Sequence, residues 1–520
     1  MKKRIFINIF SNNVGRVFEM ILGLALVPFL IRSLGLQGFG LIILAESLIE
    51  FFDMAFNGFR LALGRYVGFY LMQNKHEESN AYIASGEVIL FGIIAIASAI
   101  GFIIWVFFTR LFTVPVEFAQ GMRVLFILLI VSYLLRFRFT PAWAVIYSKQ
   151  RFDLVNIYIG FRNVTRFLLC FLIYGLFPPK LYYYGWIYLA AVMVEQVLIL
   201  RGAKKLFPNL KIRIKDASLA KIKELFSFMS FQTIGSLGHM LYARTDMILI
   251  NRFLGPAFNG IYAISLKFVN MLKRLISRSF WGLTPTFTEL VAKKDFKRVG
   301  RIYSSLTKVS ALISIPACIL LVLYGKELVF LWVGEKFKDA IVPMYIHIVG
   351  LLPSLVFACS GGVTLAFSKV KIPSIVTLFC SVLNIILSLL FALHFKMGLA
   401  GFALGAAIAI FFQTLVFSPY YTCRIAGIPY LKFYINSFVK PLVLCAAFGL
   451  FFYYLKFVTK ASILIMLLTM LVCAIFYFIL SYSLIFDMRE KSLVREFLFK
   501  FYSRLEKIKT PAFLRKRGGR

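Results

Sequence analysis

The stretch RSLGLQGFG at residues 32–40 recurs as RFLGPAFNG at residues 252–260. The Arg, the Leu and two Gly match at a constant offset of 220 positions. Each copy follows an apolar run long enough for a helix and precedes a second such run. Because glycine adopts turn conformations that other residues avoid, the pattern predicts a tight connection between two helices at both places. The repeated position indicates an internal duplication of the chain.

The composition places these helices in a membrane. Of the 520 residues, 61% are apolar and only 16% are charged, whereas a soluble domain is typically about half apolar and about a quarter charged. This composition argues against a soluble enzyme. A net charge of +37 would suggest nucleic acid as the partner of a soluble protein, but in a membrane protein it has another cause. We therefore expect no nucleic-acid partner.

Apolar runs divide the chain into about 14 segments that are long enough to cross a bilayer as α-helices, since a span needs about 20 residues. Lys and Arg concentrate in alternate connections, above all in residues 201–223 and 489–520. By the positive-inside rule this bias predicts an even number of spans, with both termini in the cytoplasm. The predicted spans are residues 7–31, 38–58, 83–108, 119–140, 154–177, 181–202, 228–251, 257–281, 303–325, 341–367, 373–395, 399–422, 436–457 and 461–486.

Six spans separate the two copies of the repeat, so the sequence predicts an all-α integral membrane protein made of two parallel six-helix repeats plus two C-terminal helices. Arg16 and Glu19 interrupt the first apolar run, which has no cleavage site, so we expect a retained span and not a signal peptide. The segment 491–507 fits either an amphipathic helix on the inner leaflet or a frayed basic tail. The predicted parts are a six-helix lobe over 1–203, a basic cytoplasmic linker over 204–227, a six-helix lobe over 228–422, two extra helices over 436–486 and a basic cytoplasmic tail over 487–520.

Polar side chains recur on one face of several predicted spans. Positions i, i+4 and i+7 share a helix face, and an ionisable group at the bilayer centre costs about 3 kcal/mol or more unless it faces a partner or a cavity. The stripes are acidic at Glu46, Glu50 and Asp53, basic at Lys267, Arg274 and Arg278, and mixed at Asn12, Arg16 and Glu19, at Gln232, Ser236 and His239, at Arg162, Asn163 and Arg166, and at Arg244 and Asp246.

These stripes allow two interpretations. The charged groups could pair and hold helices together, with Glu46, Glu50 and Asp53 bridging to the basic stripe of span 257–281. The buried Lys and Arg outnumber the buried acids, however, and this surplus favours a wet cavity that receives an anion. Phosphate or pyrophosphate fits best, because arginine binds it through two parallel hydrogen bonds. We therefore predict a cavity between the two lobes. The spans predicted to line it are 7–31, 38–58, 228–251 and 257–281.

Motifs for several other activities are missing from the sequence. It contains no GxxxxGK[ST] loop, no HExxH, no Asp-x-Asp pair and no Cys/His metal spacing. We expect no ATPase, no metal, no cofactor and no enzymatic activity, so a proton or sodium gradient would drive any pumping. The seven cysteines form no CxxC pair and predict buried thiols. Pro28, Pro316 and Pro353 lie inside predicted spans, where each can kink its helix.

Short motifs give the chain a resemblance to a known family. It resembles the polysaccharide-transport branch of the multidrug/oligosaccharidyl-lipid/polysaccharide exporter superfamily, which includes Wzx-type flippases for lipid-linked O-antigen and capsule repeat units. The resemblance covers nearly the whole chain. The residues that carry it are Pro28-x3-Arg32-x2-Gly35-x4-Gly40, then Gly58-Phe59-Arg60 with Arg65, and then Asp246-x8-Gly255-x4-Gly260-x-Tyr262.

The resemblance implies alternating access by two lobes, and an undecaprenyl-pyrophosphate-linked oligosaccharide of O-antigen, capsule or exopolysaccharide as cargo. It implies the bacterial cytoplasmic membrane as the location, with membrane lipids and the glycosyltransferases and polymerase of the same pathway as partners. We assign substrate binding to Arg16, Arg60, Arg65, Arg162, Arg166, Arg244, Asp246, Lys267, Arg274 and Arg278. We assign ion coupling to Glu19, Glu46, Glu50, Asp53 and His239, although the acidic stripe of span 38–58 is not a motif of the family.

Two other functions stay open at this point. An ion-coupled multidrug antiporter of the same superfamily would favour an acidic cavity for cationic drugs, and the predicted cavity is net basic. A membrane polysaccharide polymerase or ligase usually carries a sizeable outer loop with catalytic residues. The longest predicted outer loop, residues 326–340, is short for such an enzyme.

Overall fold

The computed structural model describes residues 2–149, 151–208, 214–281, 284–459 and 477. These residues are helical nearly throughout and contain no strand. The composition predicts this result, because a helix in a bilayer satisfies its own backbone hydrogen bonds. Apart from Tyr477, the predicted span 461–486 and the basic tail 487–520 lie outside the described residues.

The helices follow one another with short connections. Up to residue 254 they are α1 (Lys2–Met72), α2 (His76–Val106), α3 (Phe108–Leu111), α4 (Val116–Arg138), α5 (Thr140–Ser148), α6 (Phe152–Leu176), α7 (Leu181–Leu206), η1 (Ile214–Asp216) and α8 (Leu219–Leu254). Beyond it they are α9 (Pro256–Trp281), α10 (Thr284–Ala292), α11 (Phe296–Val333), η2 (Glu335–Ala340), α12 (Ile341–Val356), α13 (Ser360–Ala366), α14 (Lys371–Leu389), η3 (Leu390–His394), α15 (Leu399–Phe411), η4 (Phe412–Phe417), α16 (Ser418–Ala426), α17 (Tyr430–Tyr434), η5 (Ile435–Val439) and α18 (Lys440–Thr459).

Within the described part of the chain, ten helical segments are long and apolar enough to cross a membrane. They fall on predicted spans, and one of them, Phe18–Asp53, covers the first two. The helices α8 and α9 coincide with the predicted spans 228–251 and 257–281 but are not among the ten, which fits their polar stripes. A multi-pass, all-helical membrane fold is thus confirmed. The count of about 14 spans, the side of each terminus and the lobe boundaries stay predictions.

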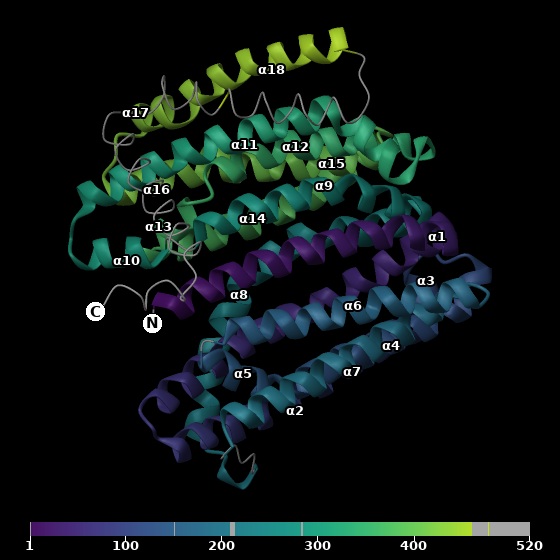
Figure 1. Cartoon of the computed structure of the whole chain (residues 1–520), viewed down its shortest axis with the longest axis vertical. Coiled ribbons are helices and arrows are strands. Elements are labelled where there is room, and N and C mark those ends of the chain that lie inside the picture. Colours follow the sequence, from purple (N-terminus) through teal and green to yellow (C-terminus); the bar gives the residue numbers. More distant parts are fainter. Residues whose placement is uncertain (1, 150, 209–213, 282–283, 460–476, 478–520) are drawn as a thin grey trace, which may run out of the picture. The chain divides into compact units, whose positions relative to one another are not determined.

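The two copies of the repeat adopt the same backbone conformation. Gly35 has φ 72° and ψ 173°, and Gly255 has φ 97° and ψ 173°. An L-residue with a side chain rarely adopts a positive φ, so glycine is needed at both positions. At Gly35 the chain bends inside α1, and the purple ribbon of Figure 1 turns sharply beside the α1 label. At Gly255 the same conformation separates α8 from α9.

The two copies also contact each other in a reciprocal way. A Cβ atom added to Gly40 would overlap the carbonyl oxygen of Pro256, and a Cβ added to Gly260 would lie 2.6 Å from Leu36 Cδ1. Pro256 corresponds to Leu36, and Gly260 to Gly40, at the offset of the repeat. Each glycine therefore meets the partner copy at the equivalent place, which is the geometry of a local two-fold axis. This symmetry supports an internal duplication.

The proline inside α1 has a specific partner. Pro28 has no N–H, so the carbonyl of Leu24, four residues earlier, loses its helical donor. The indole Nε1–H of Trp332 donates to this carbonyl oxygen at 2.9 Å. The structure thus satisfies the backbone group that the proline leaves open.

This pairing predicts a double-mutant effect. Trp332→Phe keeps an aromatic ring but leaves the Leu24 carbonyl without its donor, so we expect a loss of about 1–3 kcal/mol in stability. In a Pro28→Ala background the helix supplies a donor, and the same substitution should cost less. The temperature at which half of the detergent-solubilised protein stays monodisperse, compared among the four purified proteins, reports both effects. Equal costs of Trp332→Phe in the two backgrounds would refute the pairing.

The chain divides into two compact units. Unit 1 comprises Met1–Met271, Lys326–Gly350 and Lys371–Gln413. Within it, α1 packs against α8, α6 and α5, and α7 packs against α4 and α6; Figure 1 shows α4 and α7 side by side. This unit contains nearly all of the predicted site residues.

Unit 2 comprises Leu272–Gly325, Leu351–Val370 and Thr414–Arg520. In its described part, α13 packs against α10 and α16, and the hydroxyl groups of Tyr303 and Ser360 lie 2.8 Å apart.

The cysteines in the described part of both units are buried thiols, as predicted. Cys473 lies outside the described residues. The buried free cysteines are Cys170, Cys318, Cys359, Cys380, Cys423 and Cys445.

Candidate substrate site

The acidic stripe of α1 is a row of counter-ions inside unit 1. Glu46 Oε1 lies 3.6 Å from Arg166 Nη1 on α6, and Glu50 forms an ion pair with Arg244 on α8. Asp53 Oδ1 lies 3.3 Å from Arg60 Nη2, seven residues later on α1. The sequence suggested that these acids could pair with the basic stripe of Lys267, Arg274 and Arg278. The structure instead pairs them with the three arginines named above. The acids of one helix face therefore compensate basic groups on several elements.

A tyrosine completes the first of these pairs. Tyr184 on α7 is fully buried, and its hydroxyl donates to Glu46 Oε1 at 2.6 Å. The hydroxyl oxygen in turn accepts a hydrogen bond from Arg166 Nη1 at 3.4 Å. Since charged hydrogen bonds are stronger in a low dielectric, this arrangement fixes the carboxylate and the guanidinium together.

A further carboxylate, which the sequence did not single out, holds two arginines of the same unit. Glu195 on α7 is only 3% exposed. Its Oε2 atom lies 3.0 Å from Arg162 Nη1 on α6 and 3.8 Å from Arg136 Nε on α4. A buried carboxylate needs such partners because desolvation of an isolated charge is costly. The signal available in the sequence was a lone acid inside the apolar span 181–202.

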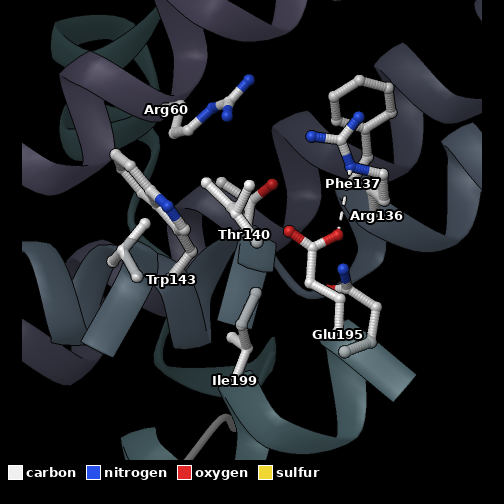
Figure 2. Close-up of a pocket in the computed structure, with 10 residues that line it drawn as sticks. Arg60, Arg136, Phe137, Thr140, Trp143, Glu195 and Ile199 are labelled. Atoms are coloured by element: carbon white, nitrogen blue, oxygen red, sulfur yellow. Dashed lines mark ion pairs between the residues drawn. The ribbon is translucent and has the colours of Figure 1, made fainter. Parts of the chain in front are cut away.

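These groups border a small cavity that Figure 2 shows. It has a volume of about 50 Å³, and Arg60, Arg136, Trp143 and Glu195 are among its lining residues. The Arg60 guanidinium carbon lies 5.3 Å from the centre of the Trp143 ring, a distance at which a cation–π attraction acts. This volume suits a few water molecules but not a sugar.

The charges around this cavity do not cancel. The guanidinium groups of Arg60, Arg136 and Arg162 outnumber the carboxylates of Asp53 and Glu195 that pair with them. One positive charge is therefore in excess among these groups. An anion that entered beside them would balance it, and bidentate arginine contacts suit phosphate oxygens.

Asp246 lies in a different environment within unit 1. It is buried, and it accepts hydrogen bonds from Tyr262 Oη at 3.0 Å and Asn384 Nδ2 at 3.3 Å. His347 Nε2 lies 2.9 Å from the same Tyr262 hydroxyl. The sequence predicted Asp246 as a substrate residue, but it missed His347 and Asn384. The described contacts of Asp246 are with neutral groups, unlike those of the acidic stripe.

The remaining predicted residues are dispersed. Lys267 is half-buried in unit 1, where its Nζ would lie 3.2 Å from a Cβ on Gly23. Glu19 is half-buried on α1, and Arg274 is exposed in unit 2. Arg65 stacks on Phe228, with 4.9 Å from the guanidinium carbon to the ring centre. The side chains of Arg16, His239 and Arg278 lie outside the described residues.

Solved structures of other proteins share this fold. A structure titled "Lipid II flippase MurJ, inward closed conformation" matches with a TM-score of 0.68 over 91% of this chain and 98% of that chain, at 17% identity. An inward-facing multidrug resistance MATE family transporter of the MOP superfamily matches with a TM-score of 0.62 over 79% of this chain and 95% of that chain, at 13% identity. The chain therefore has the fold of MurJ and MATE proteins.

Sequence comparisons point to the polysaccharide branch. Residues 183–342 match a family described as "Polysaccharide biosynthesis protein". The "Uncharacterized membrane protein EpsK" of Bacillus subtilis (strain 168) is 26% identical over 427 residues, which cover 81% of this chain and 83% of that protein. The "Putative O-antigen transporter" of Shigella flexneri is 22% identical over 424 residues, or 79% of this chain and 96% of that protein. These matches confirm the resemblance found in the sequence.

Proposed function

We propose that the chain is a flippase that moves an undecaprenyl-pyrophosphate-linked oligosaccharide, a repeat unit of O-antigen, capsule or exopolysaccharide, across the bacterial cytoplasmic membrane. The observation that carries this proposal is the excess of guanidinium groups, those of Arg60, Arg136 and Arg162, over the carboxylates of Asp53 and Glu195. Arg60, Arg136 and Glu195 line the small cavity, and Arg162 pairs with Glu195. The shared fold with MurJ and the similarity to the Shigella flexneri protein support it.

The proposed mechanism is alternating access, driven by a proton or sodium gradient and without a cofactor or enzymatic step. The arginines hold the pyrophosphate, the sugar occupies an aqueous path, and the lipid tail stays in the bilayer. Glycosyltransferases supply the cargo, and a polymerase consumes it. Asp53 of the acidic stripe keeps Arg60 oriented while no cargo is bound, because the two side chains already pair. Glu46 and Glu50 hold the neighbouring Arg166 and Arg244 in the same way.

Arg136→Ala tests the role of the excess charge. The substitution removes one positive group but leaves Glu195 paired with Arg162 at 3.0 Å, so the fold should persist. A hydrogen bond to a charged group is worth about 1.5–3 kcal/mol, so we expect transport to fall about tenfold or more. Flipping of extracted lipid-linked oligosaccharide in proteoliposomes measures this.

Arg123→Ala is the matched control, since Arg123 is an exposed arginine on the same helix, α4. We expect the control to retain transport. Undiminished flipping by Arg136→Ala would show that this cavity does not bind the pyrophosphate headgroup of the cargo.

A second candidate function is an ion-coupled multidrug antiporter, which the match to the MATE transporter favours. Expression in a drug-sensitive host distinguishes the two. Resistance to cationic dyes would support the antiporter, whereas the net positive cavity predicts none, because like charges repel.

A further inference from the structure

Unit 1 contains a second and larger cavity, whose lining shares no residue with that of the arginine and glutamate cluster. It has a volume of about 740 Å³, in the range of small-molecule sites, and it lies where the ends of α1 and α5 meet the start of α8. The predicted topology places all three ends on the cytoplasmic side. The lining residues are Gly64, Arg65, Tyr66, Gly68, Phe69, Tyr70, Gln73, Tyr147, Ser148 and Glu224.

Aromatic rings make up much of the lining of this cavity, and other aromatic side chains stack on them. Tyr66 and Tyr70 both stack on the buried Tyr82, with ring centres 5.0 and 5.1 Å apart. Tyr147 stacks on Trp143 at 4.8 Å. Stacked rings lose little further freedom when a ligand binds, so the wall is preorganised.

Two glycines allow α1 to approach α5 closely at this cavity. A Cβ on Gly64 would lie 3.2 Å from Tyr147 Cδ1, and one on Gly68 would lie 3.2 Å from Ser148 Cβ. These distances are tighter than ordinary van der Waals contact, so a larger residue would push Tyr147 and Ser148 away. The glycines therefore set the position of the α5 side of the cavity.

Planar polar groups lie among the rings. The Arg65 guanidinium carbon lies 4.9 Å from the Phe228 ring centre and 5.6 Å from that of Tyr66. Glu224 accepts a hydrogen bond from the Tyr82 hydroxyl at 2.5 Å. One cation and one anion line the cavity, so it offers no net charge to a phosphate. This balance separates it from the cluster around Glu195.

Rings and planar hydrogen-bonding groups together suit one class of ligand. A sugar ring has an apolar face of C–H groups, which packs on an aromatic face, and a rim of hydroxyls, which pair with guanidinium, carboxylate and amide groups. We infer that this cavity binds the oligosaccharide of the cargo, apart from its pyrophosphate. The inference rests on the proposed function for the source of the sugar.

Binding measurements on the full chain in nanodiscs test this assignment. The probes are undecaprenyl pyrophosphate, the lipid-linked oligosaccharide that accumulates in cells lacking this protein, and the free oligosaccharide released from it by mild acid. Native mass spectrometry detects all three by their mass, whatever the sugar composition. The variants are Tyr147→Leu and Glu224→Gln, with Lys223→Gln as an exposed neighbour outside the cavity.

We expect each cavity variant to weaken binding of the lipid-linked oligosaccharide about tenfold and to abolish binding of the free oligosaccharide. Binding of undecaprenyl pyrophosphate should change less than about twofold, and Lys223→Gln should match the native chain. The assignment would be overturned if the cavity variants lost affinity equally for the lipid-linked oligosaccharide and for undecaprenyl pyrophosphate. It would also be overturned if the unmodified protein bound these two lipids equally well. Failure of the flippase proposal is separate, because it would appear as undiminished flipping by Arg136→Ala.

Discussion

Glu195→Leu is expected to destabilise the protein by about 3 kcal/mol, because it leaves the half-buried Arg162 and Arg136 without their shared carboxylate. Leucine has a similar volume, so the effect reports charge and not a cavity. Unfolding of membrane proteins is often irreversible, so the measured quantity is the temperature at which half of the detergent-solubilised protein stays monodisperse. We expect a clear drop for this variant.

Two further variants separate the charge effect from general damage. Glu117→Ala removes an exposed acid on α4 and should leave the transition temperature unchanged. Adding Arg162→Met to Glu195→Leu removes one of the stranded charges, and replacing a buried ion pair by apolar residues is often neutral. The double variant should therefore be more stable than the single one. A double variant that is less stable would show that Glu195 does not serve as a counter-ion.

Gly40→Ala is expected to cost about 3 kcal/mol or more, because the new methyl group would overlap the backbone carbonyl of Pro256. Backbone at a helix start cannot move aside as a flexible side chain can. We therefore expect poor recovery of folded protein, and loss of transport in what remains. Expression followed by size-exclusion chromatography measures the first effect, and flipping in proteoliposomes the second.

Other glycines supply a graded series for comparison. The new methyl group of Gly260→Ala would lie 2.6 Å from the tip of the Leu36 side chain, which can rotate, and 3.1 Å from the Leu36 carbonyl oxygen. This substitution should therefore cost about 1–2 kcal/mol, less than Gly40→Ala. Gly92 lies inside α2 with nothing within 4 Å of a new Cβ. Gly92→Ala should stabilise by about 0.5–1 kcal/mol, since alanine favours a helix. Any other order among the three would contradict the reciprocal contact.

The sequence predicted best those features that repeat or that have a period. Apolar runs placed the helices, and the spacing of Gly35 and Gly255 located two backbone positions that share a positive φ. The acidic stripe was also visible, because Glu46, Glu50 and Asp53 lie on one helix face. These signals are local, and local spacing is what a single sequence carries.

Local spacing could not identify the ion-pair and hydrogen-bond partners that lie on different helices. The sequence could not show that Glu50 pairs with Arg244, almost two hundred residues later, or that Arg136 and Arg162 meet at Glu195. Glu195 is the lone acid of the predicted span 181–202, so no periodic pattern of polar residues singles it out. The neutral surroundings of Asp246 were hidden for the same reason, since Asn384 and His347 lie on α14 and α12.

The reciprocal contact of residues 36–40 and 256–260 links the evolution of two distant parts of one gene. In a homodimer, one mutation would change both sides of such an interface at once. Here each side mutates alone, so the copies were free to diverge into Leu36 on one side and Pro256 on the other. That freedom is smaller at Gly40, where a Cβ would overlap a rigid carbonyl, than at Gly260, where the nearest atom is the end of the Leu36 side chain and the Leu36 carbonyl oxygen would lie 3.1 Å away. Substitutions in either stretch should therefore be interpreted together with the residue 220 positions away.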